Sequence, residues 1–233
     1  MEEKSDLTDS LKMRRDNQIS GFEFQVSRLS VAYLPPVSYF MSMLRSENIL
    51  LEAHENYVKQ SYRNRCKIAA ANGVETLSIP VESNRGEKVS IREVRISEHD
   101  NWQKIHWRGI TSAYRNSPYF DFLEDDFRPF YEKKWKFLWD YNLELLTLVL
   151  NLLDVQPVIR FTEKYEAEPQ SDKDLRELIH PKKEPVLISK PYYQVFENKF
   201  GFRQDLSIID LIFNMGNEAI LYLSAPFSKG GIS

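Results

Sequence analysis

The sequence predicts an α/β fold: a βαβ start with a mixed sheet, followed by a mainly helical C-terminal half. Three stretches predict this start: a strand over residues 29–34, a buried helix over 37–44 and a second strand over 48–52. Pro35 and Pro36 end the first strand because proline fixes φ and lacks a backbone donor. Such a unit has a right-handed crossover, and ligands of such sheets bind beyond the carboxyl ends of the strands.

Two further strands are predicted over residues 74–81 and 90–97. The polar loop 82–89 joins them as a hairpin-like connection. Because hairpin strands are antiparallel, this part of the chain predicts that the sheet is mixed.

Helical patterns dominate the next part of the chain. One helix is expected from the N-cap candidate Asp100 to about residue 115, and a second over 122–140 with a fault at Pro129. A third over 142–153 is the most apolar, so it is expected in the core.

A polar, proline-containing stretch over residues 156–191 predicts a long surface connection with one short helix near 172–179. The pattern then returns to ordered elements, with a helix over 207–214 that Gly216 stops. We therefore predict one domain over residues 27–226, preceded by a flexible arm over 1–26 and followed by a tail over 227–233.

The composition excludes several classes of protein. Of 233 residues, 42% are hydrophobic and 13% aromatic, which is enough for a core. The 31 basic and 34 acidic residues give a net charge of −3, so no global positive field attracts nucleic acid or an anionic membrane. No signal peptide and no apolar run long enough to span a membrane is visible. The single cysteine, Cys66, excludes an internal disulfide and suits the cytoplasm.

The densest polar cluster follows the second predicted strand. If it is helical, Lys59, Tyr62 and Arg63 share a face, and if it is extended, Arg63 and Arg65 point the same way. Either geometry offers charged donors to a phosphate or carboxylate. The alternative is a solvated face on which these cations pair with acids such as Glu52 and Glu55. The candidate anion-binding residues are Lys59, Arg63 and Arg65, with Tyr57, Tyr62 and Asn64 beside them.

The turn at Tyr33, Pro35 and Tyr39 is a second candidate. A strand end there meets a helix start, whose free backbone N–H groups bind anions. The alternative is a rigid packed turn, because two prolines reduce the donors and no glycine-rich cradle follows.

Other reactive residue types give weaker signals. His99 and His106 lie seven apart, about 10 Å on a helix, too far to share a metal ion. His106 suits either a buried histidine or an acid–base group, and Cys66 suits a small buried side chain better than a nucleophile. No metal site and no cofactor is predicted. Two acidic groups fit solvated or capping positions, namely Glu124–Asp126 and the set Asp210, Asn214 and Glu218.

Several sequence blocks, in order, resemble the WbqC-like protein family. The resemblance extends from about Leu29 to Leu223, and it implies a role in making or modifying nucleotide-activated sugars for O-antigen-type surface polysaccharides. The chain departs from many relatives at Leu34, where they have glutamine, and after the second strand, where their Asp-Asp pair is missing. The blocks are YLPPVSYF (33–40), YVKQSYRNR (57–65), LSIPV (77–81), SPYF (117–120) with Trp102 and Tyr114, and LSIIDLIFNMG (206–216).

Two functional hypotheses follow. One is an enzyme, a transferase or ligase whose Lys59, Arg63 and Arg65 bind a nucleotide-sugar or other phosphorylated small molecule; removal of Arg63 is then expected to abolish binding without lowering the melting temperature. The other is a non-catalytic binding or scaffold protein of the same pathway. It would bury a partner on aromatic surfaces around Trp102, Trp107, Trp135 and Trp139. The oligomeric state stays open.

Overall fold

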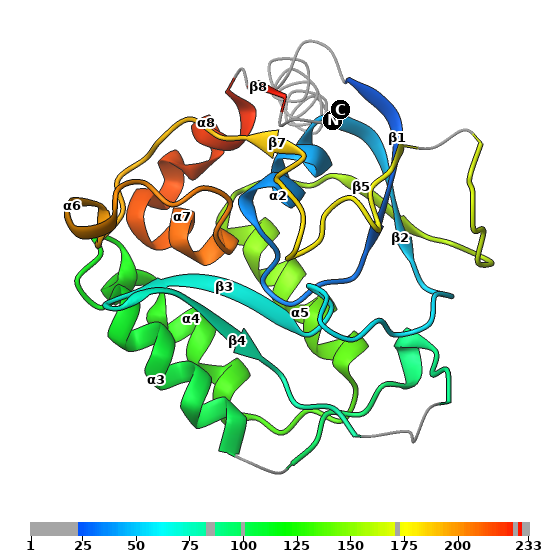
Figure 1. Ribbon diagram of the computed structural model, residues 1–233, viewed down its shortest axis with the longest axis horizontal. Helices are drawn as coiled ribbons and strands as arrows, with labels where there is room; N and C mark the ends of the chain where they lie inside the picture. Colours follow the sequence, from blue (N-terminus) through cyan, green and yellow to red (C-terminus); the bar gives the residue numbers. More distant parts are fainter. Residues whose placement is uncertain (1–22, 83–86, 99–100, 171–172, 226–227, 230–233) are drawn as a thin grey trace, which may run out of the picture.

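The computed structural model describes residues 23–82, 87–98, 101–170, 173–225 and 228–229. It confirms the α/β class, with a parallel sheet formed from the N-terminal part and a mainly helical half after it (Figure 1). The predicted arm lies outside the described residues up to position 22, and of the predicted tail only 228–229 are described. Within the described residues, no helix has the length and apolar character needed to cross a membrane.

Four parallel strands form the main sheet, in the order β5-β2-β1-β6. The central strands are β1 (Phe24–Ser30) and β2 (Ser46–Glu52), in a register that sets Leu29 opposite Leu51. β1 therefore starts inside the predicted arm and ends before the predicted limit of the strand. The outer strands are β5 (Val158–Phe161) and β6 (Lys173–Asp174).

The crossover between β1 and β2 is the predicted helix, α2 (Val37–Leu44), and all eight of its residues are buried. α2 packs on β2 on one side and on two C-terminal helices on the other, which are α7 (Ile208–Met215) and α8 (Ala219–Ser224) (Figure 1). A helix that is covered all round has no polar stripe, which fits its sequence: its two serines, Ser38 and Ser42, are buried and hydrogen-bonded.

The antiparallel pairing predicted for the sheet occurs in a separate hairpin, β3 (Arg65–Ala70) and β4 (Gly73–Ser78). Gly73 turns the chain with φ at 117°, which favours glycine. The strand predicted over 90–97 is wrong: that segment holds a 3-10 turn at Ile91–Glu93 and single bridges, one of which joins Ile96 to Val81. Few of its backbone N–H and C=O groups pair with a neighbouring strand, so the alternation of apolar and polar side chains does not make this segment a strand.

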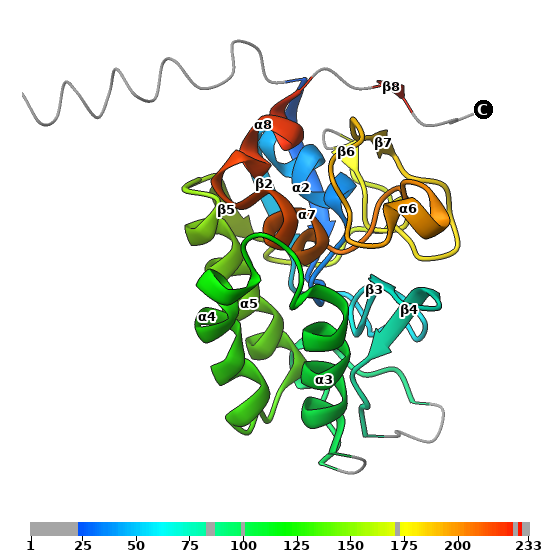
Figure 2. The same ribbon diagram turned by 90° about the vertical axis from the view of Figure 1, so that its left-hand side faces the viewer.

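Three helices form a layer beside this hairpin: α3 (Trp102–Tyr114), α4 (Phe120–Glu132) and α5 (Leu138–Leu152) (Figure 2). The helix predicted over 122–140 is α4, which continues through Pro129 but ends three residues after it, and the helix predicted over 142–153 is α5, which begins four residues earlier at Leu138. The N-cap candidate Asp100 lies outside the described residues.

The helix predicted near residues 172–179 is also wrong, since the described part of that stretch starts as strand β6. The C-terminal helix is confirmed as α7, and Gly216 ends it at φ 53°. A Cβ atom at Gly216 would lie 2.5 Å from the ring of Tyr119, so only glycine fits there. The remaining short elements are β7 (Leu187–Ile188), α6 (Glu197–Phe200), the 3-10 turn Gly216–Glu218 and β8 (Ser228–Lys229).

Candidate functional site at the carboxyl ends of the parallel strands

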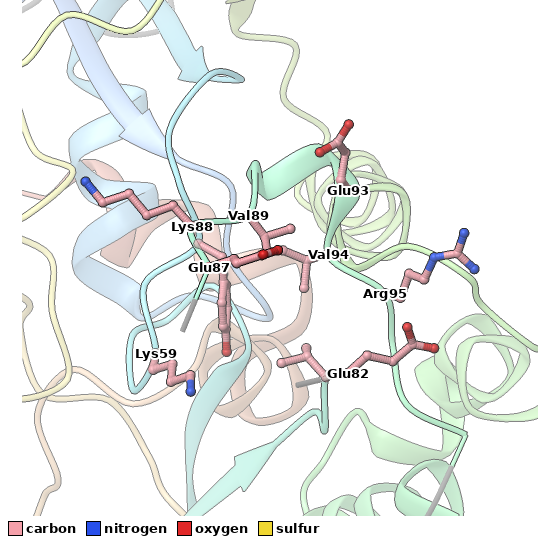
Figure 3. Close-up of a pocket in the computed structure, with 10 residues that line it drawn as sticks. Lys59, Glu82, Glu87, Lys88, Val89, Glu93, Val94 and Arg95 are labelled. Carbon is pink, nitrogen blue, oxygen red and sulfur yellow. The ribbon is translucent and has the colours of Figure 1, made fainter. Parts of the chain in front are cut away.

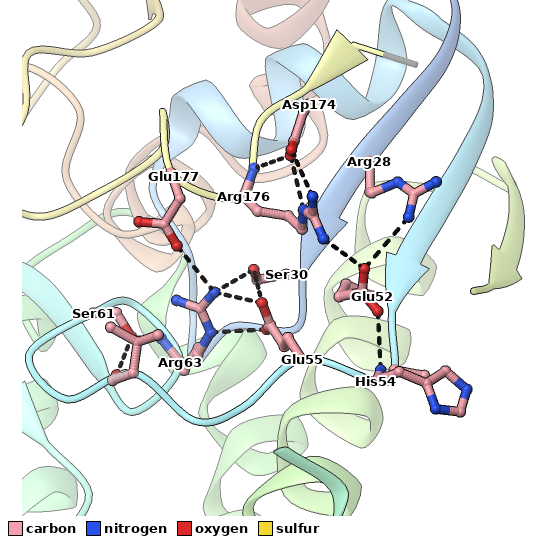
Figure 4. Close-up of polar contacts among 12 residues, drawn as sticks. Arg28, Ser30, Glu52, His54, Glu55, Ser61, Arg63, Asp174, Arg176 and Glu177 are labelled. Carbon is pink, nitrogen blue, oxygen red and sulfur yellow. Dashed lines mark hydrogen bonds and ion pairs between the residues drawn. The ribbon is translucent and has the colours of Figure 1, made fainter. Parts of the chain in front are cut away.

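A cluster of buried charged side chains lies where the parallel strands end (Figure 4). β1 supplies Arg28 and Ser30, and β2 ends at Glu52. The loop after β2 supplies Glu55 and Arg63, while the segment after β6 brings in Arg176. This is the edge at which open parallel sheets bind their ligands.

Glu52 is the centre of one half of the cluster, and its side chain is fully buried. Its Oε1 accepts hydrogen bonds from Thr162 Oγ1 at 2.7 Å and from the backbone N–H of His54 at 2.9 Å. Its Oε2 accepts from Arg176 Nη1 at 2.7 Å and lies 3.5 Å from Arg28 Nη1. Both oxygens are thus satisfied, as a buried carboxylate requires.

Arg176 ties its segment to this carboxylate. Its Nε and Nη2 donate to Asp174 at 2.9 and 2.7 Å, and Nη2 also donates to the Glu166 carbonyl at 2.7 Å. Partial burial opposes the charge on Asp174, but its bonds with Arg176 outweigh burial and hold the pKa of Asp174 below its usual value. We call Glu52, Asp174 and Arg176 the clasp, because they fasten residues 162–170 and 173–176 over the sheet edge.

Arg63 is the centre of the other half and is 3% exposed. It forms a bidentate pair with Glu55, from Nε to Oε1 at 2.8 Å and from Nη2 to Oε2 at 2.5 Å. Nη2 also donates to Ser30 Oγ at 2.8 Å. Burial raises the pKa of Glu55, although Arg63 and Ser30 oppose that rise. On the backbone side, Asn142 of α5 donates to the Arg63 carbonyl at 2.7 Å, so the helical layer also fixes this residue.

One end of the Arg63 guanidinium remains available. Across the described part of the chain, Nη1 makes no hydrogen bond, and Figure 4 shows it pointing away from Ser30 and Glu55. Glu177 approaches the same group at 3.7 Å from Nη2, but this carboxylate is 66% exposed. A small cavity beside Arg63 is lined in part by Ser30, Tyr62 and Arg176. This arrangement can bind an anion through charge-assisted hydrogen bonds.

The structure does not bring the three predicted cations together. Lys59 is exposed and lines a different pocket of about 570 Å³ together with Tyr57. In Figure 3, Lys59 and Lys88 lie on one side of that pocket and Arg95 on the other, among acidic side chains. Arg65 lies on β3, and its buried Nε has no hydrogen-bond partner in the parts of the chain that the structure describes.

The remaining predicted residues are buried and bonded. The Tyr39 hydroxyl donates to the Ser30 carbonyl at 3.0 Å, and Tyr62 lines the cavity beside Arg63. The Asn64 side-chain amide donates to the Ile79 carbonyl at 2.8 Å, and the Pro35 carbonyl accepts from the Ile208 N–H at 2.9 Å. Tyr39 and Tyr62 thus line the same small cavity as Arg63.

The start of α2, predicted to face an anion, holds an internal carboxylate. Asp205 accepts from the Ser38 N–H at 2.8 Å and from its hydroxyl at 3.0 Å. Burial raises the pKa of Asp205 to about 6, while the bonds from Ser38 oppose the rise. The packed-turn alternative therefore describes the contacts seen at this position.

His106 and Cys66 are enclosed by aromatic residues. His106 is 3% exposed, and its Nδ1 lies 3.0 Å from the hydroxyl of Tyr33, which lies 3.0 Å from that of Tyr131. Burial lowers the pKa of His106 to about 4, so the ring is neutral at pH 7. Burial likewise raises the pKa of the fully buried Cys66 thiol. Among the described residues, no three His, Cys, Asp or Glu side chains are grouped to hold a metal ion.

The sequence of the chain matches a known family. The sequence model of the WbqC-like protein family covers residues 31–184. The chain belongs to the WbqC-like protein family. The WbqC-like chain is also similar to the protein named Uncharacterized protein Rv1507c of Mycobacterium tuberculosis, at 25% identity over 217 residues, which cover 82% of this chain and 94% of that protein. No solved structure matches it.

The family match covers Glu52, Glu55, Arg63 and the rest of the clasp, but it begins after β1 and so leaves out Arg28 and Ser30. Sequence reasoning named Arg63, but it named Glu52 and Glu55 only as alternative partners of surface cations. It missed Arg28, Asp174 and Arg176 entirely. A signal existed only for Arg28, a cation in the part of β1, residues 27–30, that is buried throughout. Arg176 lies in a polar stretch without any local pattern that marks it.

Proposed function

We propose that this WbqC-like protein binds a phosphorylated small molecule through Arg63, at the carboxyl ends of β1 and β2. A nucleotide-activated sugar is the proposed ligand, and transfer or ligation in cytoplasmic surface-polysaccharide biosynthesis is the proposed role. The observation that carries the proposal is the guanidinium of Arg63: it is buried, its orientation is fixed by Glu55 and Ser30, and its Nη1 is unbonded within the described residues.

A buried arginine with a purely structural role at this position would cost the fold stability. Burial of an ion pair costs several kcal/mol per ion, and the pair contributes stability only if the remaining donors are satisfied. Arg176 meets that condition within the protein through all three of its nitrogens, whereas Nη1 of Arg63 has no partner among the described residues and is left to solvent or a ligand. A phosphate oxygen would supply the missing acceptor for Nη1 through a charge-assisted hydrogen bond.

The ion pair with Glu55 changes the effect on stability that we expect from the removal of Arg63. Arg63→Ala would leave a buried carboxylate unpaired, at a cost of about 3–5 kcal/mol. The expectation of an unchanged melting temperature therefore does not fit the structure. Arg63→Lys is the better probe, because it keeps a positive charge near Glu55 but removes the second end of the fork.

Thermal shift against phosphate, pyrophosphate, nucleoside diphosphates and nucleotide sugars tests the proposal. A ligand at one hundred times its Kd stabilises the folded chain by about 2.7 kcal/mol, or roughly 5–10 °C for a chain of this size. We expect such a shift for the wild type and its loss in Arg63→Lys. The matched control is Arg45→Lys, a second buried guanidinium, which donates to the carbonyls of Met41, Leu223 and Ala225 outside this cavity and should keep the shift. An equal shift in wild type and Arg63→Lys would contradict the proposal.

A second candidate, the non-catalytic binding protein, has one observation in its favour. Trp102, Trp107 and Trp135 line a pocket of about 600 Å³ together with Tyr131, a size and lining typical of binding sites. Trp139 does not contribute, because it is buried beneath Arg92. No thermal shift with any phosphorylated compound, together with tryptophan fluorescence that acrylamide quenches, would favour this candidate.

A further inference from the structure

A basic turn at residues 180–183, with the sequence His-Pro-Lys-Lys, lies against the loop that carries Arg63. Lys182 Nζ donates to Gln60 Oε1 at 2.8 Å, three residues before Arg63. Lys67 of β3 donates through Nζ to the Pro181 carbonyl at 2.6 Å. Two long-range contacts thus hold the turn next to a segment about 120 residues earlier in the chain.

The turn adds positive charge around Arg63. The side chains of Lys182 and Lys183 are exposed, and His180 is close enough to Arg63 for their charges to interact. Partial burial is the main reason that the pKa of His180 is lowered, and the neighbouring Lys183, Lys182 and Arg63 add to the effect. The whole chain has a net charge of −3, so this is a local concentration of cations.

The cations around Arg63 differ in how deeply they are buried. Arg63 is recessed at 3% exposure, whereas the side chains of Lys182 and Lys183 are exposed. If one phosphate binds Arg63, a second phosphate attached to it would extend outward toward the turn. A single inorganic phosphate has no group to place there.

Glu177 is the acidic residue beside Arg63 on its solvent side. Its carboxylate lies 3.7 Å from Arg63 Nη2 and is 66% exposed, so solvent screens the attraction. An anion at this distance competes with a ligand phosphate for the same guanidinium. The Glu177 carboxylate also repels phosphate until the Glu177 side chain moves aside.

We infer that the basic turn binds the second phosphate of a ligand that carries two linked phosphates, such as a nucleoside diphosphate group. This inference rests on the proposed binding of an anion by Arg63. Glu177 then sets specificity, because it excludes weakly charged anions that cannot displace it. Lys182 and Lys183 are the residues that distinguish a diphosphate from a monophosphate.

The test is titration calorimetry of the full chain with pyrophosphate and with inorganic phosphate. We expect Lys182→Ala/Lys183→Ala to weaken pyrophosphate binding about tenfold, the combined effect of two partly exposed charge contacts, and to change phosphate binding by less than about twofold. Glu177→Gln should strengthen the binding of both probes. The matched control, Arg108→Ala/Arg115→Ala, removes two exposed cations of α3 and should change neither affinity.

The outcomes separate the two proposals. If wild type binds neither probe, both the proposed function and the role of the turn are wrong. If wild type binds pyrophosphate, Arg63→Lys abolishes binding and the double lysine variant binds normally, the role of the turn alone is wrong. Equal weakening of phosphate and pyrophosphate by the double variant would also overturn it, because the turn would then attract any anion.

Discussion

Buried titratable groups in this protein respond to acid in opposite directions. His106 is neutral when folded, with a pKa of about 4, whereas an unfolded histidine has a pKa of about 6.5. Asp205 and Asp210 behave oppositely, because burial raises each pKa to about 6, above the unfolded value of about 3.9. The contribution of His106 is lost as pH falls below about 6.5, while the cost of the two charged aspartates falls over the same range.

His106→Gln tests this balance. Between pH 7 and pH 5 the unfolded histidine takes up a proton and the folded one does not, which lowers the free energy of unfolding of the wild type by about 2 kcal/mol. The variant lacks that loss, so its stability relative to wild type should rise on acidification by about this amount. Urea unfolding at both pH values measures the difference. A constant difference would mean that His106 takes up its proton at the same pH in the folded and the unfolded chain, so that burial does not lower its pKa.

The clasp attaches one segment of the chain, residues 162–170 and 173–176, to the sheet edge. Arg176→Ala would leave the fully buried Glu52 with only Arg28, at 3.5 Å, as a cationic partner. We expect the free energy of unfolding to fall by about 3–5 kcal/mol. Trypsin should also cut sooner at Lys164 and Lys173, because the segment loses its attachment.

Lys164→Ala is the matched comparison, since it removes a cation of the same segment. Its ion pair with Glu166, at 3.4 Å, is 78% exposed on the lysine side, so its loss should cost less than about 1 kcal/mol. Urea midpoints of the two variants decide the matter. Similar small losses in both would show that the clasp contributes little to the attachment of this segment.

Elements with a strong local pattern were predictable, and elements defined by distant pairing were not. The β1-α2-β2 unit can be recognised in the sequence because its two strands, the proline pair and the apolar helix are adjacent. β5 has four residues and β6 only two, and each pairs with a strand more than one hundred residues earlier. The same reason separates the two buried arginines, since Arg63 follows a predicted strand, whereas Arg176 gains its role only when the chain returns to Glu52.

The whole molecule depends on a region beyond the family match, which ends at residue 184. Five consecutive apolar or acidic residues of α7, from Ile208 to Ile212, are almost fully buried, and the helix covers α2. Each large apolar side chain contributes about 1.5–3 kcal/mol, so their sum approaches the total stability of a typical domain.

A chain that ends at residue 184 should therefore not fold cooperatively. We expect weak near-ultraviolet circular dichroism and no sharp urea transition, while the full chain shows both. The comparison is a chain that ends at residue 225, which keeps α7 and α8 and should unfold like the full chain. A sharp transition in the shorter chain would show that the helices after residue 184 are dispensable for folding.

The order of the strands has a consequence for synthesis on the ribosome. β1 and β2 leave the ribosome first, but their outer neighbours β5 and β6 follow only after residue 158. At 5–20 residues per second, the interval is roughly 5–20 s. During that time both edges of a two-stranded parallel ribbon offer unpaired backbone groups to other chains. Chaperones that shield strand edges would therefore protect the nascent chain during this interval.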